Sequence, residues 1–232
     1  NYMKKKEENV DLLKYEKELY EKGITLIGGV DEVGRGPLVG PVVAACVILP
    51  VNYELPGLDD SKKISEKKRD QFYDIIMRDA ISVGVGIVGP EKIDEINILE
   101  ASRLAMKIAI ENLSVKPEFI LSDAMKLTNI DIPYQDIIHG DALSLSIAAG
   151  SVIAKVTRDR MMYELDKEYP EYGFAKHKGY PTKAHLENLA KYGVLANYRF
   201  TYKPVSDLIN NAKVVVRKWK YFIIMFLKIT FY

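Results

Sequence analysis

The chain has 232 residues, of which 48% are hydrophobic and 28% are charged, and these are the proportions of an ordinary globular protein with room for one core domain. Because 33 basic residues nearly balance 32 acidic ones and the net charge is +1, overall charge does not argue for nucleic acid, and any such site must depend on local arrangement. A single cysteine, Cys46, excludes a disulfide framework and a thiolate metal cluster.

The first half of the chain predicts three helices and three strands. In chain order these are a charged helix over residues 8–22, apolar strands over 24–30 and 41–49, an amphipathic helix over 66–79, a strand over 81–88 and a long helix over 90–113. The first two strands flank a Gly/Pro loop, which favours an antiparallel pair. Ser65 suits the N-cap of the helix that follows it, because its hydroxyl can accept a hydrogen bond from an N–H of the first turn.

The second half alternates strands and helices and then becomes rich in turns. The predicted elements are a short buried strand over residues 119–121 that ends at Asp123, a strand over 132–138, a helix over 144–167, and a single helix over 182–191 within the turn-rich residues 168–205. Three leading strands followed by strand–helix alternation predict an α/β fold with a sheet of mixed direction.

The tail, residues 206–232, contrasts with the rest of the chain, because its aromatic and apolar residues show no clear face. A buried extra element, a partner-binding segment and an out-of-frame terminus all fit this pattern. The third interpretation ranks as highly as the first, because an exposed run of this kind is an aggregation hazard.

The sequence IGGVDEVGRGPLVGP at residues 27–41 contains the strongest chemical signal. Asp31 and Glu32 end an apolar run, and an arginine flanked by glycines, Arg35, follows them. Adjacent carboxylates can hold a divalent metal, whereas the guanidinium and the backbone amides of a glycine loop can bind a phosphate. The combination points to phosphodiester chemistry.

Two further carboxylates occupy comparable places, because Asp123 ends a later strand and Asp141 lies between a strand and a helix. Strand ends of an open α/β sheet meet at the crevice where sites are built, so we expect these acids to converge with Asp31 and Glu32. Hard cations such as Mg²⁺ prefer oxygen ligands, and two ions about 3.5–4 Å apart would support an in-line displacement. Taken alone, each acid is more typical of a solvated loop. The adjoining glycine loop and the small-residue helix after Asp141 favour the functional role.

Five blocks in a fixed order resemble prokaryotic ribonuclease HII over roughly residues 20–205. They are DEVGRGPLVGPVVAA (31–45), LDDSKKIS (58–65), INIL (96–99), GDALSLSIAAGSVIAKVTRDRMM (140–162) and YGFAKHKGYPT (172–182). The resemblance implies a ribonuclease H-like fold, in which helices flank a mixed five-stranded sheet and a small helical part forms the C-terminus. We divide the chain accordingly into a lead-in helix (1–22), a catalytic domain (23–168), a substrate-binding part (169–205) and an atypical tail (206–232).

The resemblance implies a metal-dependent endoribonuclease that hydrolyses the RNA strand of RNA–DNA hybrids and cuts 5′ of ribonucleotides embedded in duplex DNA. Members of this family require Mg²⁺ or Mn²⁺, use a two-metal in-line mechanism, and leave a 5′-phosphate and a 3′-hydroxyl. The expected partner is nucleic acid and the expected state is a monomer. We expect a cytoplasmic protein with no membrane association, because the sequence has neither an apolar signal run at its N-terminus nor a span of about 20 apolar residues.

Carried over position by position, the resemblance assigns metal binding to the four carboxylates named above. It also assigns roles to a GRG loop, made of Gly34, Arg35 and Gly36, which matches the segment that recognises the ribose 2′-hydroxyl and the adjoining phosphate. Tyr180 matches a tyrosine that stacks on the following deoxyribose. Nearby cations are candidates for phosphate contacts: Lys62, Lys63, Lys155, Arg158, Lys176 and Lys178. His177 is expected to be a scaffold residue or a phosphate contact rather than a general base.

Some positions depart from the family pattern. Asp123 is followed by Ala124 where glycine is usual, so a positive φ there would cost about 1 kcal/mol. Gly150 replaces an alanine in a helix interior, which weakens the helix by up to about 1 kcal/mol. In the run NYRFTYKPV, Tyr198 and Tyr202 stand where the family has histidine and phenylalanine.

Two rival functions fit part of the pattern. One is a nucleic-acid-binding protein with this fold and little activity, which would follow if Ala124 or the tail disturbed the site. Mg²⁺-dependent nicking of a duplex with one ribonucleotide would exclude it. The other is a carboxylate–metal phosphatase for small substrates, which fits the acids but leaves the GRG loop and Tyr180 unexplained.

Overall fold

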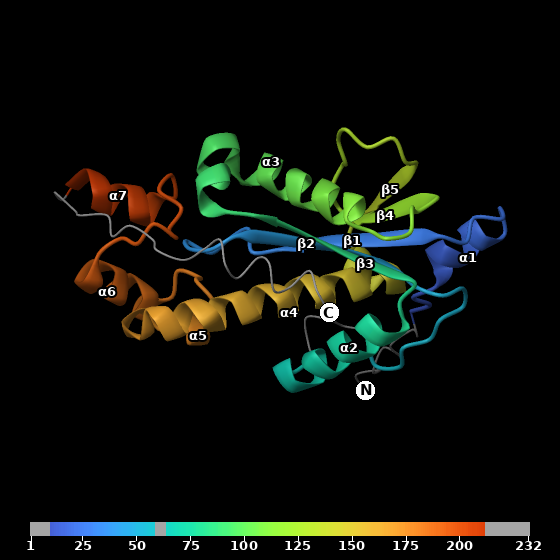
Figure 1. The fold of residues 1–232 in the computed structure, drawn as a ribbon, viewed down its shortest axis with the longest axis horizontal. Coiled ribbons are helices and arrows are strands. Elements are labelled where there is room, and N and C mark those ends of the chain that lie inside the picture. Colours follow the sequence, from blue (N-terminus) through green and yellow to red (C-terminus); the bar gives the residue numbers. More distant parts are fainter. Residues whose placement is uncertain (1–9, 59–63, 212–232) are drawn as a thin grey trace, which may run out of the picture.

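Five strands form one mixed sheet in the computed structural model, which describes residues 10–58 and 64–211 (Figure 1). The strands are β1 (Ile27–Val33), β2 (Val42–Ile48), β3 (Ser82–Val88), β4 (Phe119–Asp123) and β5 (Tyr134–Ile137), in the spatial order β3-β2-β1-β4-β5. β2 pairs antiparallel with β1 and β3, whereas β4 pairs parallel with β1 and β5. The predicted α/β class, the mixed five-stranded sheet and the antiparallel first pair are confirmed.

Helices cover both faces of the sheet. The helical elements of the described residues are α1 (Lys14–Tyr20), α2 (Glu66–Asp79), α3 (Pro90–Glu111), η1 (Gly140–Ala142), α4 (Leu145–Glu168), η2 (Pro170–Tyr172), α5 (Phe174–His177), α6 (Lys183–Tyr192) and α7 (Lys203–Asn211). α3 lies on one face, α4 and α2 lie on the other, and α5 to α7 gather beyond one end of the sheet (Figure 1). The N-cap prediction is confirmed, because the Ser65 hydroxyl accepts the Lys68 N–H at 3.3 Å.

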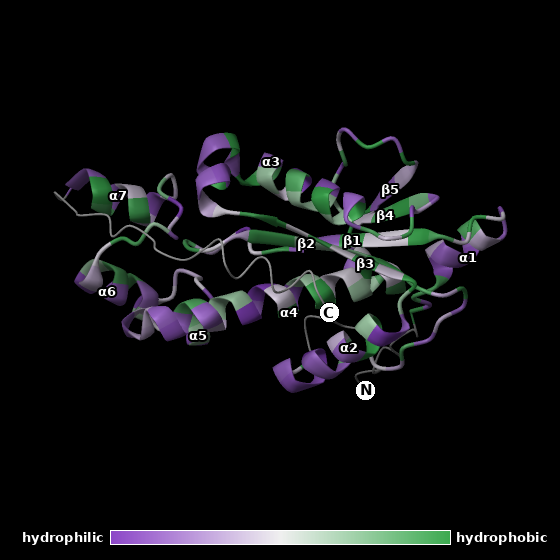
Figure 2. Cartoon of the chain, in the orientation of Figure 1, coloured by the Kyte–Doolittle hydropathy of each residue, from purple (hydrophilic) through white to green (hydrophobic). Residues whose placement is uncertain are grey.

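β2 shows why the sheet needs helices on both faces. Its side chains alternate between two cores: Val43, Ala45 and Val47 pack on the side of α4 and α2, and Val42, Ala44 and Cys46 pack on the side of α3. Every residue of β2 is buried, as expected for a central strand covered on both sides. In Figure 2 β2 is accordingly hydrophobic, whereas the outer helix α2 is largely hydrophilic.

α4 crosses β1 at close range because glycines stand at the crossing. A Cβ on Gly29 would lie 2.0 Å from the carbonyl carbon of Ser146, and a Cβ on Gly150 would lie 2.8 Å from the carbonyl oxygen of Ala45. Gly150, which departs from the family pattern, therefore permits tight packing that offsets its cost in helix propensity. The close crossing holds the N-terminal end of α4, and the residues just before it, against the sheet.

Three predicted boundaries differ from the structure. β1 runs to Val33, so that Asp31 and Glu32 lie inside the strand. The helix predicted over 90–113 is kinked at Asn97, where φ is 68° and the side chain accepts the Leu99 N–H at 2.9 Å to begin a second helical segment. The prediction of a single helix in the C-terminal part is wrong, since α5, α6 and α7 lie there and α7 extends past residue 205.

Some predictions fall outside the described residues. Lys62 and Lys63 lie outside them, as does the tail beyond Asn211. Among the helices of residues 10–58 and 64–211, none combines the length and the apolar character that a membrane span requires.

Candidate active site

The four predicted carboxylates come from three segments that meet at one edge of the sheet. β1 and β4 are adjacent and parallel, so Asp31 and Glu32 near the end of β1 and Asp123 at the end of β4 reach the same edge. Asp141 lies in η1, directly before α4. A cavity of about 380 Å³ lies there, and it is lined by the four acids with Val33, Arg69, Ser151, Val152, Lys155 and Tyr180. The structure therefore brings the predicted acids and Tyr180 together.

Burial and like charge both act on these acids. Asp31 is 6% exposed, and burial raises its pKa well above the ordinary value, with the charges of Glu32 and Asp123 adding to the effect. Burial also raises the pKa of Glu32, where the Arg35 guanidinium opposes the shift and Asp123 adds to it. Negative charge is thus costly in this cavity, and a cation would offset the cost.

Backbone N–H groups orient two of the carboxylates. Asp31 Oδ1 accepts the Glu32 N–H at 2.7 Å, and Asp123 Oδ1 accepts the Gly140 N–H at 2.7 Å. Across the described part of the chain, no three acidic, histidine or cysteine side chains are drawn together as the ligands of one ion. The acids share a cavity without forming a closed ligand set, as expected for like charges that repel in a medium of low dielectric constant.

The donors nevertheless suit a hard divalent cation. The lining offers carboxylate oxygens and the Ser151 hydroxyl, and it contains neither histidine nor cysteine among the described residues. Glu32 Oε1 lies 3.5 Å from Arg35 Nη1, whereas the buried Glu32 Oε2 has no hydrogen-bond partner within residues 10–58 and 64–211. Oxygen ligands of this kind, supplemented by water, are those that Mg²⁺ and Mn²⁺ prefer.

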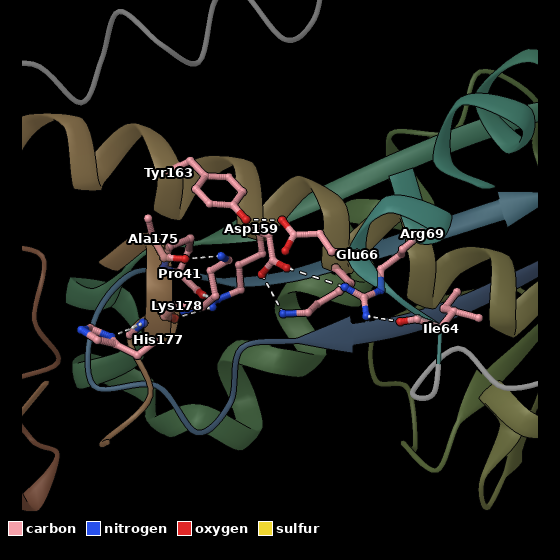
Figure 3. Close-up of polar contacts among 12 residues, drawn as sticks. Pro41, Ile64, Glu66, Arg69, Asp159, Tyr163, Ala175, His177 and Lys178 are labelled. Atoms are coloured by element: carbon pink, nitrogen blue, oxygen red, sulfur yellow. Dashed lines mark hydrogen bonds and ion pairs between the residues drawn. The ribbon is translucent and has the colours of Figure 1, made fainter. Parts of the chain in front are cut away.

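Two cations on the cavity wall are held by one buried carboxylate, Asp159 (Figure 3). Lys155 Nζ lies 2.7 Å from Asp159 Oδ1, and Arg69 Nη1 lies 3.9 Å from Asp159 Oδ2. Arg69 also donates to the carbonyl of Ile64 at 3.1 Å. Neither Arg69 nor Ser151 was predicted from the sequence as part of the site. The spacing could have indicated Ser151, because residues 151, 155 and 159 follow one another at four-residue intervals on one side of α4. No sequence pattern indicates Arg69, because its position depends on how α2 packs on α4.

The GRG loop lies beside Tyr180. A Cβ on Gly36 would stand 3.4 Å from the ring carbon Cε1 of Tyr180. Gly34 has φ +93°, and a Cβ there would stand 2.3 Å from Arg158 Nε, so both its conformation and its surroundings require glycine. The two segments predicted to read the substrate are therefore neighbours, and Tyr180 joins them to the carboxylate cavity.

Two fully buried arginines bind backbone carbonyls around this loop. Arg158 donates to the carbonyls of Pro41, Lys178 and Val39 at 2.9–3.1 Å. Arg199 donates to the carbonyls of Gly34, Arg35 and Gly40 at 2.6–3.1 Å. The prediction that Arg158 contacts phosphate is therefore wrong, because the packing of α4 buries its guanidinium. Burial, reinforced by the charge of Arg199, lowers the pKa of Arg158 to about 10, which leaves it protonated at neutral pH.

The remaining predicted phosphate contacts differ in their surroundings. Lys176 is exposed, whereas the Lys178 ammonium donates to the Ala175 carbonyl and lies 3.9 Å from the centre of the Tyr163 ring. His177 is buried, accepts the Gly179 N–H at Nδ1, and stacks on His185 with ring centroids 4.1 Å apart. His177 is thus a scaffold residue, which is one of its two predicted roles.

Comparison with known proteins identifies the family. The family model for ribonuclease HII matches residues 28–205. A curated ribonuclease HII from Bacillus cytotoxicus is 58% identical over 206 residues, which cover 89% of this chain and 79% of that protein. A ribonuclease HII from Bacillus cereus is 57% identical over 206 residues, which cover 89% of this chain and 80% of that protein.

Solved structures share the fold. Ribonuclease H2 from Pyrococcus horikoshii has a TM-score of 0.69 and 25% identity, covering 80% of this chain and 97% of that one. Ribonuclease HII from Archaeoglobus fulgidus, solved as a complex with PCNA, has a TM-score of 0.65 and 25% identity, covering 79% and 96%. Bst-RNase HIII, solved in complex with Mn²⁺, has a TM-score of 0.62 and covers 81% of this chain and 70% of that one. At 17% identity it shows the fold alone.

The fold, the site and the relatives agree. The mixed sheet carries the acids at one edge, and the family model covers the residues from β1 through α6 and the start of α7. More than half of the aligned residues are identical to those of the curated relatives. The chain therefore belongs to the ribonuclease HII family and is an endonuclease of the ribonuclease H type that acts on RNA–DNA hybrids.

Proposed function

We propose that the chain, besides acting on hybrids, cuts duplex DNA on the 5′ side of an embedded ribonucleotide and leaves a 5′-phosphate and a 3′-hydroxyl. One observation carries the proposal: the cavity that contains the four acids also contains Tyr180, whose ring adjoins Gly36 of the GRG loop. General phosphodiester hydrolysis needs only the acids. The neighbouring loop and ring supply groups that can examine the sugar, which favours a substrate in which a ribose meets a deoxyribose.

In this proposal Asp31, Glu32, Asp123 and Asp141 hold Mg²⁺ or Mn²⁺. When bound, such ions supply an activated water and stabilise the leaving oxygen of an in-line displacement. The chain itself orients the ligand oxygens, because the N–H groups of Glu32 and Gly140 fix the carboxylates of Asp31 and Asp123. Arg69 and Lys155 add positive charge on the same wall, where a substrate phosphate would lie.

The GRG loop and Tyr180 are proposed to distinguish ribose from deoxyribose. The 2′-hydroxyl is the group that tells RNA from DNA at a given site, and glycine lets the backbone approach a sugar closely. Tyr180 is 39% exposed, so its ring is available to stack on the deoxyribose that follows. Lys62 and Lys63 are proposed to contact phosphates, and the enzyme is proposed to act as a monomer.

Cleavage of a labelled duplex with one ribonucleotide, in Mg²⁺, Mn²⁺ or EDTA, tests the proposal. We expect one nick 5′ of the ribonucleotide with either metal, no nick in EDTA, and none in the same duplex made of DNA alone. Extension of the nicked strand by a polymerase would verify the 3′-hydroxyl, and gel filtration of the active enzyme would verify the monomer. Cleavage of long hybrids without any nick at the single ribonucleotide would reject the proposal while leaving the family assignment intact.

Tyr180 provides a sharper test of how the junction is read. Stacking of this kind contributes about 1–3 kcal/mol, so Tyr180→Ala should lower kcat/KM on the single-ribonucleotide duplex by about 10–100-fold. The loss on long hybrids should be smaller, because every site there has a ribose on both sides. Tyr180→Phe is the matched control, since it keeps the ring and should keep most of the activity. Equal losses on both substrates would contradict junction-specific stacking.

A further inference from the structure

One carbonyl of the GRG loop accepts two hydrogen bonds from the C-terminal part of the chain. Arg35 O accepts Arg199 Nη1 at 2.8 Å and the Tyr202 hydroxyl at 2.7 Å. Arg199 also donates to Gly34 O at 2.6 Å, and its Nη1 donates to the Tyr202 oxygen at 3.0 Å. Arg199 is fully buried and its bond to Gly34 O is buried with it, so that bond is shielded from water, whereas the bond from the Tyr202 hydroxyl to Arg35 O lies at the surface. We refer to Arg199 and Tyr202 as the carbonyl clamp.

The carbonyl clamp determines which backbone groups of the GRG loop face away from Arg199 and Tyr202. The described residues contain no cis peptide bond, and in a trans peptide the N–H points away from the C=O of the same unit. Because the carbonyls of Gly34 and Arg35 face the clamp, the N–H groups of Arg35 and Gly36 face away from it. Neither N–H has a hydrogen-bond acceptor within the described part of the chain. Successive N–H groups that point the same way form a concavity for negative or lone-pair oxygens.

We propose that Tyr202 is a positioning residue whose hydroxyl, together with the Arg199 guanidinium, holds the GRG loop so that the Arg35 and Gly36 N–H groups meet the sugar–phosphate of a ribonucleotide. This inference rests on the proposed function, because it names a determinant of that site's preference for ribose. The hydroxyl supplies a second donor to Arg35 O and so strengthens a loop that Arg199 alone would hold less firmly.

The arrangement allows the hydroxyl to be removed without the ring. The Arg199 guanidinium carbon lies 5.1 Å from the centre of the Tyr202 ring, and phenylalanine would keep this cation–π contact. Arg35 O would also keep its bond from Arg199. Tyr202→Phe should therefore fold normally and loosen only the loop. Because Gly36 adjoins the Tyr180 ring, a looser loop would also disturb the place where the ribose and the following deoxyribose are proposed to bind.

The test compares the binding of two duplexes that differ in a single 2′-hydroxyl, measured in EDTA so that no cleavage occurs. The parent should bind the ribonucleotide-containing duplex more tightly than the all-DNA duplex. The preference is the Kd for the all-DNA duplex divided by the Kd for the ribonucleotide-containing duplex. Tyr202→Phe should lower this ratio by about 3–10-fold, which is what the loss of one hydrogen bond implies. Tyr172→Phe is the matched control, because it removes another tyrosine hydroxyl of the C-terminal part, one that donates to Gly193 O at 2.9 Å instead of to a carbonyl of the GRG loop. The control should leave the ratio unchanged.

Backbone ¹⁵N relaxation of residues 35 and 36 gives a second readout that does not depend on substrate. The order parameters of these two N–H groups should be lower in Tyr202→Phe than in the parent and unchanged in Tyr172→Phe. A parent without any preference for the ribonucleotide would reject the proposed function, whereas a parent with the preference and an unaltered Tyr202→Phe ratio would overturn the positioning role alone. Unaltered order parameters in Tyr202→Phe would overturn it as well, whatever the binding result.

Discussion

The cavity of the acids and the GRG loop beside it are stabilised in opposite ways. On the side of the acids, burial and mutual repulsion raise the pKa values of Asp31 and Glu32, so the folded chain holds charge there at a cost. On the side of the GRG loop, Arg158 and Arg199 are buried cations whose donors are satisfied by backbone carbonyls. The acids are therefore poised for a ligand of opposite charge, whereas the arginines serve the fold. Removing charge should cost activity on the first side and stability on the second.

The largest effect is expected on the side of the acids. Asp123→Asn removes one negative charge but keeps the oxygen that accepts the Gly140 N–H at 2.7 Å. We expect turnover to fall by at least about 1,000-fold, or about 4 kcal/mol in the activation free energy. The free energy of unfolding in EDTA should stay the same or rise, because a repulsive charge is lost. Cleavage assays and urea unfolding of the same preparation measure both quantities.

Asp136→Asn is the matched control for Asp123→Asn. Asp136 is an exposed residue on β5, next to β4, and it is not part of the cavity lining described above. Its replacement should change neither turnover nor stability measurably. Normal cleavage by Asp123→Asn would remove this carboxylate from the catalytic site, and a large loss of stability would show that it serves the fold instead.

The opposite result is expected for Arg199→Gln. The substitution leaves the carbonyls of Gly34 and Gly40 without their buried donor, whereas Arg35 O keeps the Tyr202 hydroxyl, and each unsatisfied group costs about 1–3 kcal/mol. With partial relaxation, we expect the free energy of unfolding to fall by about 3–4 kcal/mol. Arg160→Gln is the control, because Arg160 is about half exposed and pairs with Asp70 at 3.6 Å, an interaction that contributes about 0–1 kcal/mol. Similar stability of the two variants would contradict the clamp.

Lowering the pH should change the free energy of unfolding in opposite directions through His185 of the C-terminal part and through the acids of the cavity. His185 is buried, with Nδ1 2.8 Å from Tyr180 O and Nε2 2.8 Å from the Tyr198 hydroxyl. Burial, reinforced by His177, lowers its pKa from 6.5 to about 4. Between these values the unfolded chain binds a proton that the folded chain does not, so stability falls as the pH is lowered. On the side of the acids the raised pKa values act the other way, because there the folded chain binds protons first.

Urea unfolding in EDTA at pH 6.5 and 4.5 measures the contribution of His185. The lowered pKa of His185 alone should reduce the free energy of unfolding of the parent by about 2 kcal/mol between these two pH values. His185→Gln is the comparison, because an amide can donate to Tyr180 O and accept from the Tyr198 hydroxyl without titrating. The variant should lose about 2 kcal/mol less than the parent over the same range. The same pH dependence in both proteins would mean that folding does not lower the pKa of His185.

The side of the acids could be predicted from the sequence, whereas the side of the loop could be predicted only in part. Carboxylates that end strands leave a pattern, because the topology of an open sheet brings strand ends together. The GRG loop is visible as a glycine motif, but its clamp is not. Arg199 and Gly34 are 165 residues apart, and an arginine that binds carbonyls has no acidic partner whose spacing could indicate it. Arg158 was assigned to phosphate for the same reason.

The fold shows the same division between local and long-range information. The five strands were predictable because short apolar runs between turn residues need little context. α5 and α7 were missed because they are short, with 4 and 9 residues, and short helices depend on tertiary packing. Here the packing comes from buried aromatic residues, among them Tyr172, Phe174 and Tyr198. The kink at Asn97 was missed because its φ of 68° overrides an otherwise continuous helical pattern.

The smallest predicted effect returns to the acids and concerns Ala124. Its φ is 49°, a left-handed conformation that costs a residue with a Cβ about 1 kcal/mol or more. Ala124→Gly should therefore raise the free energy of unfolding by about 0.5–1 kcal/mol, after allowing for the greater freedom of glycine in the unfolded chain. Ala80→Gly, at φ −64°, is the control and should lower the free energy of unfolding.

Activity should respond much less to Ala124→Gly than to Asp123→Asn. The Asp123 carboxylate is fixed by the Gly140 N–H at 2.7 Å as well as by its own strand, so relief of strain one residue later should leave its oxygens in place. We expect turnover within about twofold of the parent, an effect below 0.5 kcal/mol. A rise of tenfold or more would show that Ala124 displaces the carboxylate and that the orientation of this acid depends on the backbone after β4 instead of on the η1 turn.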